Sequence, residues 1–112
     1  MVHKIVEQLR LRPQAMYNAK ERDKLRADEK REALRKYLVE KGCVDCGYNH
    51  HHAALEFDHL PGYTKIKNVM AMTYNSWEVI WAEVEKCEVV CANCHAIRTH
   101  ERRLDKVANA MI

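Results

Sequence analysis

The sequence predicts an α+β fold in which a small core follows one long helix. Residues 14–40 contain no Gly or Pro and are rich in strong helix formers. Two Cys-x-x-Cys pairs bracket the segment after this helix. Between the pairs, one stretch alternates apolar and polar residues as a strand does, and a later stretch has helical periodicity. A chain of 112 residues with this pattern is one small domain plus an extension, which we divide into residues 1–41 and 42–112.

The cysteine pairs predict a zinc site formed by Cys43, Cys46, Cys91 and Cys94. Two-residue spacing lets both thiolates of a pair turn onto one ion, and four thiolates complete the tetrahedron of structural zinc. An odd count of five cysteines and the lack of a secretory signal favour zinc in a reducing cytosol over disulfides. Because so short a core buries little apolar surface, we expect the metal to supply folding energy.

The long helix over residues 14–40 follows Pro13, which ends a short helical pattern in residues 1–11. Four residues lie within two turns of the first cysteine pair and should pack on the core: Ala33, Leu34, Tyr37 and Leu38. Residues 20–31 are charged all round, which is typical either of a solvated or paired helix or of a DNA-contacting arm. The excess of basic residues lies in the N-terminal part of the chain: residues 1–41 hold 12 Lys or Arg against 7 Asp or Glu, whereas residues 42–112 hold 7 Lys or Arg against 9 Asp or Glu.

Residues 54–59 indicate a short half-buried strand, with Leu55 and Phe57 on one face. Strict alternation sends Asp58 and His59 to opposite faces, so both can reach one phosphate only at the strand's end, where a turn begins. The preceding histidines, at residues 50–52, have the composition of a metal site. Because four thiolates already satisfy the zinc, we interpret them as exposed loop residues.

Two more helices are predicted. Ser76 is a suitable N-cap for a helix through residue 86, after a loop or weak strand over residues 65–73. Its apolar face consists of Trp77, Ile80, Trp81 and Val84, and we interpret both tryptophans as core residues rather than base-stacking ones. The unpaired Cys87 fits a small buried hydrophobe. The last helix runs over residues 92–109 and has His95 in its first turns.

Asp58, His59 and His95 are the candidate catalytic residues. The four cysteines use up the zinc tetrahedron, so His95 is adjacent to the zinc site but free for another role. A carboxylate and an imidazole can hold a divalent ion that keeps open positions for water and phosphate, while a neighbouring neutral histidine takes a proton from the attacking water. This combination favours a hydrolytic site over a purely structural one.

The segments CVDCG, LEFDH and KCEVVCANCH resemble the HNH endonucleases, which have a ββα-metal core and a four-cysteine zinc. The resemblance covers roughly residues 42–103, a little over half of the chain. It implies that His59 is the general base, and that Asp58 and His95 are ligands of a catalytic divalent ion such as Mg²⁺ or Mn²⁺.

The middle residue of the HNH pattern differs in this chain. Family members often have Asn nine positions before the final histidine, where its side chain braces the loop that holds the base. Lys86 occupies that position here, and Asn75 and Asn93 are nearby alternatives, so the role stays unassigned.

The substrate that the resemblance implies is DNA. Two groups of side chains are candidate contacts: Lys65 and Lys67 after the strand, and Arg98, His100, Arg102 and Arg103 on the last helix. Ordinary surface lysines are an equal alternative for the first group. His100 is also a candidate for a third ligand or a substrate contact.

We therefore predict a metal-dependent DNA endonuclease. The main alternative is a non-catalytic zinc-knuckle module that binds nucleic acid or protein, and a nuclease toxin is a weaker third. One active site cuts one strand, so double-strand cleavage needs a homodimer, two sequential nicks or a protein partner. No apolar run approaches a membrane span, which favours a cytoplasmic protein with no membrane partner. The resemblance also suggests a phage or mobile element as the source.

Overall fold

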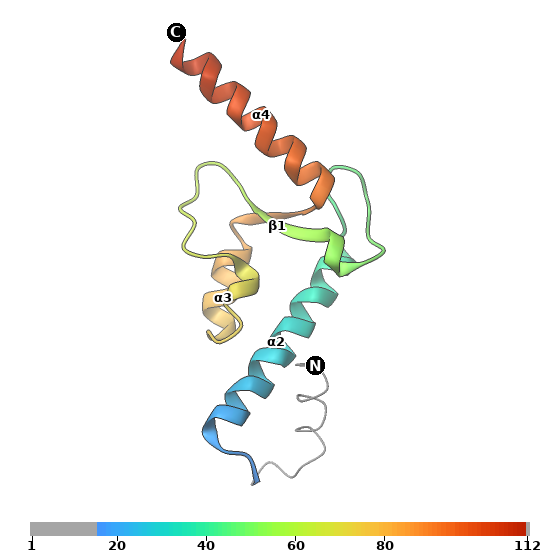
Figure 1. Ribbon diagram of the computed structural model, residues 1–112, viewed down its shortest axis with the longest axis vertical. Coiled ribbons are helices and arrows are strands. Elements are labelled where there is room, and N and C mark those ends of the chain that lie inside the picture. The colour runs from blue at the N-terminus through green and yellow to red at the C-terminus, as the bar shows by residue number, and fades with distance from the viewer. Residues whose placement is uncertain (1–15, 112) are drawn as a thin grey trace.

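The computed structural model describes residues 16–111, and over these residues the fold is α+β, as predicted (Figure 1). The elements follow one another as α2 (Ala19–Lys41), the short 3-10 turn η2 (His52–Ala54), β1 (Leu55–His59), the turn η3 (Val69–Ala71), α3 (Trp77–Val84), β2 (Cys87–Cys91) and α4 (Ala92–Ala110). The short helix predicted for residues 1–11 lies outside the described residues.

Helix α2 begins later than predicted because Asn18 caps it. The Asn18 side chain accepts a hydrogen bond from the backbone N–H of Glu21 at 2.8 Å and donates one to the Glu21 carboxylate at 3.1 Å, so the two residues satisfy each other's polar groups. The helix ends at Gly42, whose φ of 69° suits glycine and whose N–H donates to the Leu38 carbonyl at 2.8 Å. A Cβ at position 42 would lie 3.1 Å from the Asn49 Cβ, so the turn into the first cysteine pair needs glycine.

Strands β1 and β2 form an antiparallel pair that separates two layers of helix. Leu55 lies opposite Cys91, and His59 lies opposite Cys87. Directly opposed residues share a face, so side chains two apart on β1 face the same layer. One face of the sheet is covered by α4, whereas α2 and α3 lie on the other side (Figure 1).

Two small groups of buried residues make up the core. The first joins α2 to the sheet and the cysteine pairs and consists of Leu38, Cys43, Leu55, Val89, Val90 and Cys91. The second joins α2 to α3 and η3 and consists of Leu34, Val69, Met72, Ile80 and Val84. The prediction that the last turns of α2 pack on the core is confirmed for Leu34, Leu38 and the partly buried Tyr37, but Ala33 is exposed.

The prediction for the two tryptophans is only half right. Trp77 packs against the second core group, but Trp81 is 38% exposed, stacks on Trp77 and meets the ring of Tyr37 in an edge-to-face contact. The buried face of α3 passes through Ile80, Glu83 and Val84 instead, which leaves Trp81 at its edge. Ser76 caps this helix as predicted, by accepting from the Val79 N–H at 3.4 Å.

The remaining elements differ from the sequence prediction at their ends: α3 ends at Val84 rather than at residue 86, and α4 ends at Ala110 rather than at residue 109. The strand begins at Leu55 rather than at residue 54, and residues 65–73 form a loop that contains η3. Cys87 is half-buried beside the second core group. Within residues 16–111, no helix has both the length and the apolar composition needed to cross a bilayer.

Candidate functional site

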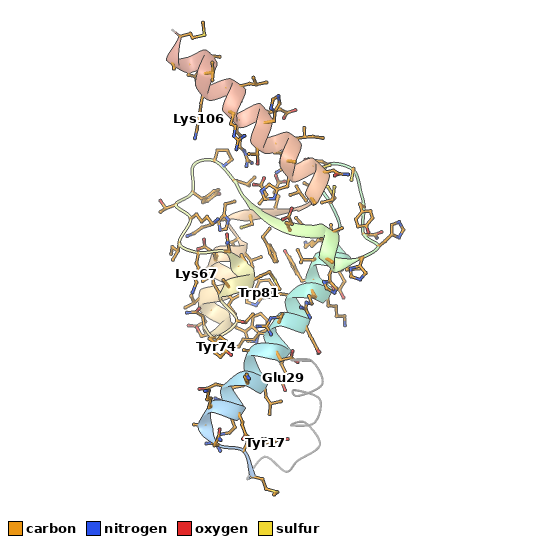
Figure 2. The ribbon with its side chains drawn as sticks, viewed as in Figure 1. Tyr17, Glu29, Lys67, Tyr74, Trp81 and Lys106 are labelled. Atoms are coloured by element: carbon orange, nitrogen blue, oxygen red, sulfur yellow. The ribbon has the colours of Figure 1, made fainter. Side chains whose placement is uncertain are left out.

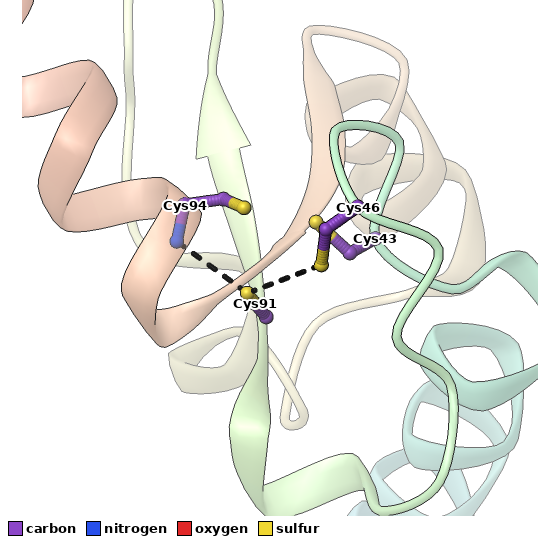
Figure 3. A group of neighbouring side chains, drawn as sticks. All are labelled: Cys43, Cys46, Cys91 and Cys94. Carbon is purple, nitrogen blue, oxygen red and sulfur yellow. Dashed lines mark hydrogen bonds between the residues drawn. The ribbon is translucent and has the colours of Figure 1, made fainter.

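Cys43, Cys46, Cys91 and Cys94 converge on one point, and their sulfurs all lie within 4.8 Å of one another. The first pair lies in the turn after α2, Cys91 ends β2, and Cys94 lies in the first turn of α4 (Figure 3). Because all four are free thiols in a cluster of this size, they can hold one metal ion. The cluster predicted from the cysteine spacing is therefore present.

Local backbone geometry brings each pair together. The N–H of Cys43 donates to the Tyr48 carbonyl and the N–H of Gly47 donates to the Cys43 carbonyl, both at 2.8 Å, which closes a tight turn around the first pair. At the second pair the sulfur of Cys91 caps α4 by accepting from the Cys94 N–H at 3.4 Å. A residue at the cap and one three positions later lie on the same side of a helix start, so both sulfurs face the first pair.

The thiols differ sharply in acidity. Burial opposes ionisation of Cys43, but backbone N–H groups of Cys91, Cys46 and Asp45 outweigh it and lower its pKa to about 6. Hydrogen bonding with Cys91, together with burial, raises the pKa of Cys94. One thiolate thus makes further ionisation of its neighbours unfavourable, and a bound cation would remove that penalty.

Asp58 and His95 meet on the face of the sheet that α4 covers. The Nε2 atom of His95 lies 3.4 Å from the Oδ1 atom of Asp58, and the Asp58 side chain is 3% exposed. On the other side of the ring, His95 Nδ1 lies 3.2 Å from the Oε1 atom of Glu56. The two predicted metal-ligand atoms, Asp58 Oδ1 and His95 Nε2, are therefore close enough together to contact a single ion.

Two arginines of α4 hold the Asp58 carboxylate. Arg102 donates to both of its oxygens at 2.8 Å, and Arg98 donates to Oδ2 at 2.9 Å. Burial disfavours the charged form of Asp58, but the hydrogen bonds from Arg102 and Arg98 outweigh it, so its pKa lies below the usual value. Asp58 is consequently a carboxylate that is both buried and charged.

Arg98 links three carboxylates and faces away from open solvent. Its guanidinium donates two hydrogen bonds to Asp45, at 2.7 and 2.8 Å, and one to Glu88 at 3.1 Å, in addition to the one to Asp58. Asp45 lies between the two cysteines of the first pair. Arg98, predicted as a DNA contact, thus fixes the cysteine turn to the sheet.

His59 lies on the opposite face of the sheet from Asp58, as alternation requires. Its Nε2 atom is 2.7 Å from the Oε2 atom of Glu83, and the His59 side chain is 11% exposed. Glu83 is a buried residue of α3 that the sequence analysis did not single out. The available signal was its position between Ile80 and Val84, on the apolar face of the helix.

A hollow of about 410 Å³ connects His59 to the arginine of the Asp58 site. It is lined by His59, Pro61, Arg102, Asp105 and Lys106. Figure 2 shows Lys106 extending from α4 on the side of the loop that follows β1. Lys106, which the sequence analysis omitted, therefore lines the same hollow as the candidate base, whereas the predicted contacts Lys65 and Lys67 are not among its lining residues.

The other predicted DNA contacts lie on the surface. Lys65, Lys67, His100 and Arg103 are exposed. Of the three loop histidines, His50 and His51 are exposed as predicted, and His52 is partly buried. None of the six histidines within residues 16–111 belongs to a metal cluster of three or more residues.

The fold and the site together define a small α+β domain with a four-cysteine metal-binding cluster. No protein-family model, curated protein or solved structure matches the chain.

Proposed function

We propose that this protein is a metal-dependent HNH-type endonuclease that hydrolyses DNA phosphodiester bonds. The observation that supports it most is the combination at the end of β1. Asp58 and His95 approach within 3.4 Å of each other, and the adjacent His59 borders a hollow lined by two cations, Arg102 and Lys106. In this proposal β1, β2 and α4 are the two strands and the helix of a ββα-metal core.

Zinc is the ion we assign to the cysteine cluster. A tetrahedral ion with zinc–sulfur bonds of about 2.3 Å separates its sulfurs by roughly 3.8 Å. The sulfurs of Cys46 and Cys91 are 3.7 Å apart, and the other two lie within the same small cluster. Four thiolates leave no position open for substrate, so this zinc stabilises the fold and does not take part in the reaction.

The Asp58 and His95 pair fits a second, catalytic divalent ion. When the neutral ring of His95 has its proton on Nδ1, it donates to Glu56 and its Nε2 lone pair faces Asp58 Oδ1. Two acceptors then face each other across 3.4 Å, and either a second proton on His95 or a cation satisfies both. Arg102 also donates to Asp58 Oδ1, so it must yield that oxygen to an ion.

The protein's own side chains would divide the work of hydrolysis. When bound, the divalent ion would offset negative charge on the phosphate and on the leaving oxygen. His59 accepts the proton of the attacking water, which is a contribution of about two or more orders of magnitude in rate. Arg102 and Lys106 bind the phosphate in the hollow, since a guanidinium and an ammonium both pair with phosphate oxygens.

One observation favours the alternative of a non-catalytic zinc module. The buried Asp58 carboxylate is fully satisfied by Arg98 and Arg102, so its presence can be explained by the attachment of α4 to the sheet. In that case Asp58 is structural, and His95 lies beside the cluster without holding an ion. The module would bind nucleic acid but would not cut it.

Substitution of the two donor residues separates these functions. With Asp58→Asn and His95→Ala, we expect DNA nicking to fall by at least 100-fold while zinc content stays at one per chain, and a higher concentration of Mg²⁺ or Mn²⁺ to restore part of the rate. His50→Ala, a substitution of an exposed loop histidine, is the control and should cut like the parent. If the two donor variants cut as fast as the parent, Asp58 and His95 hold no catalytic ion.

A further inference from the structure

Glu83 is an acidic residue with almost no contact with solvent. It is 1% exposed and lies on the face of α3 that packs on the core, beside Ile80 and Val84. A buried carboxylate is unfavourable unless each of its oxygens has hydrogen-bond partners. The partners of Glu83 therefore indicate why the fold keeps it.

Both oxygens of Glu83 are occupied by groups from the end of β1, the following loop and the end of α3. Oε2 accepts from the Ile66 N–H at 3.0 Å and from His59 Nε2 at 2.7 Å. Oε1 accepts from Lys86 Nζ at 2.9 Å, and Lys86 also donates to the Thr64 carbonyl at 2.8 Å. Glu83 thus joins the candidate base to the loop that follows it.

Glu83 is ionised in this setting. Burial raises its pKa, but the hydrogen bonds from Lys86, Ile66 and His59 outweigh burial and lower the pKa to about 2. An ionised carboxylate only accepts hydrogen bonds, so the proton in the short contact with His59 belongs to Nε2. A neutral imidazole with its proton on Nε2 has its lone pair on Nδ1.

We propose that Glu83 is a positioning residue that holds His59 in the Nε2–H tautomer and leaves Nδ1 as the atom that accepts the proton from water. Lys86 is its companion: it pairs with Glu83 and braces the loop at Thr64. Lys86 occupies the position at which the HNH resemblance leads one to expect Asn. The inference rests on the proposed function, since it concerns the base of that reaction.

If the ion pair between Glu83 and Lys86 were purely structural, the expected result would be different. Its loss would lower stability and leave the ring of His59 unchanged. Positioning instead requires that the His59 tautomer changes when the carboxylate is neutralised. The tautomer can be read without any cleavage assay, from the ring ¹⁵N chemical shifts of histidine-labelled, zinc-loaded protein.

The experiment compares the parent with Glu83→Gln and, as a matched control, with Glu85→Gln, an exposed residue two positions away. His59 is assigned by the signal that disappears in His59→Ala. We expect the parent and Glu85→Gln to show a protonated Nε2 and an unprotonated Nδ1, and Glu83→Gln to show a mixture of tautomers. An Nδ1–H ring in the parent would overturn the inference without any need for a folded variant.

Cleavage kinetics then test the consequence. Glu83→Gln should lower kcat in proportion to the lost fraction of the Nε2–H tautomer, about 2-fold for an even mixture, because a ring protonated on Nδ1 cannot accept the proton there, while KM and zinc content stay those of the parent. Unchanged tautomer or unchanged kcat in folded Glu83→Gln would refute positioning. A parent that does not cut DNA with any ion would refute the proposed function, and the NMR result would still show whether Glu83 sets the tautomer.

Discussion

Removal of one thiol from the four-cysteine cluster should unfold the protein over residues 16–111. Within residues 16–111, eleven of the thirteen buried apolar residues form two groups of six and five side chains, and small domains with cores of this kind rarely gain more than about 3–5 kcal/mol of net stability from packing. Structural zinc contributes about 10–16 kcal/mol of apparent binding free energy at neutral pH. Since the zinc contribution exceeds the net stability, Cys91→Ser should lose the metal and the fold together.

The assay combines native mass spectrometry with circular dichroism, and Cys87→Ser is the matched control. Cys87 is outside the cluster, and its sulfur donates to the Glu83 carbonyl at 3.4 Å, a bond that a serine hydroxyl can also make. We expect Cys87→Ser to retain one zinc and a cooperative thermal transition, and Cys91→Ser to show neither. A metal-free Cys91→Ser protein with the thermal midpoint of the parent would refute the reasoning.

Three further predictions concern charge and packing. Arg98→Met should lower stability and zinc retention because Arg98 fixes the cysteine turn to the sheet. Arg103→Met should leave both unchanged and reduce the slope of log K against log salt for DNA binding by about 1. Equal effects of the two variants on zinc retention would contradict these roles. Glu83 has a depressed pKa, so its stabilisation is present above the unfolded value of about 4.5 and is lost as pH falls toward 2. The difference in unfolding free energy between the parent and Glu83→Gln in excess zinc should therefore be constant above pH 5 and shrink below pH 4.5, and a difference independent of pH would count against the charged carboxylate. Leu34→Ala should cost about 2–5 kcal/mol in chemical denaturation, against less than about 0.5 kcal/mol for the exposed Leu104→Ala, and a loss for Leu34→Ala as small as that of the control would show that α2 is an appended extension rather than part of the core.

The features that depend on residues close in the chain were predictable from the sequence. The Cys-x-x-Cys spacing brings two sulfurs together through a local turn, and the cap at Ser76 needs only the first turn of α3. Alternation along β1 also predicted correctly that Asp58 and His59 point to opposite faces, because the side-chain period of a strand is fixed by the backbone.

The features that depend on tertiary packing were not predictable. Glu83 meets His59 only because α3 packs under the sheet, 24 positions along the chain from its partner. Arg98 was expected at an open DNA-binding surface, but the position of α4 over the sheet brings three carboxylates to it. The spacing of Arg and Lys along a helix therefore does not show whether they contact phosphate or form internal ion pairs. That depends on which residues the fold places opposite them.

The same limit applies to Trp81. Its spacing from Trp77 and Val84 fits a single apolar stripe, which predicted burial. The short helix α3 turns Ile80, Glu83 and Val84 inward, so Trp81 lies at the edge of that face and stays 38% exposed. Periodicity gives the side of a helix that is apolar but not the centre of the face that its neighbours cover.

Cleavage of supercoiled plasmid by the zinc-loaded protein tests the central claim most directly. The parent should convert plasmid to nicked or linear DNA when Mg²⁺ or Mn²⁺ is added and leave it intact without an added ion. His59→Ala should bind the same DNA and retain zinc, but its cleavage rate should fall by about 100-fold or more. His50→Ala, in the exposed loop, should cut like the parent. A parent that binds the plasmid but never cuts it with any divalent ion, or a His59→Ala variant that cuts at the parental rate, would contradict the assignment of a nuclease with His59 as its base.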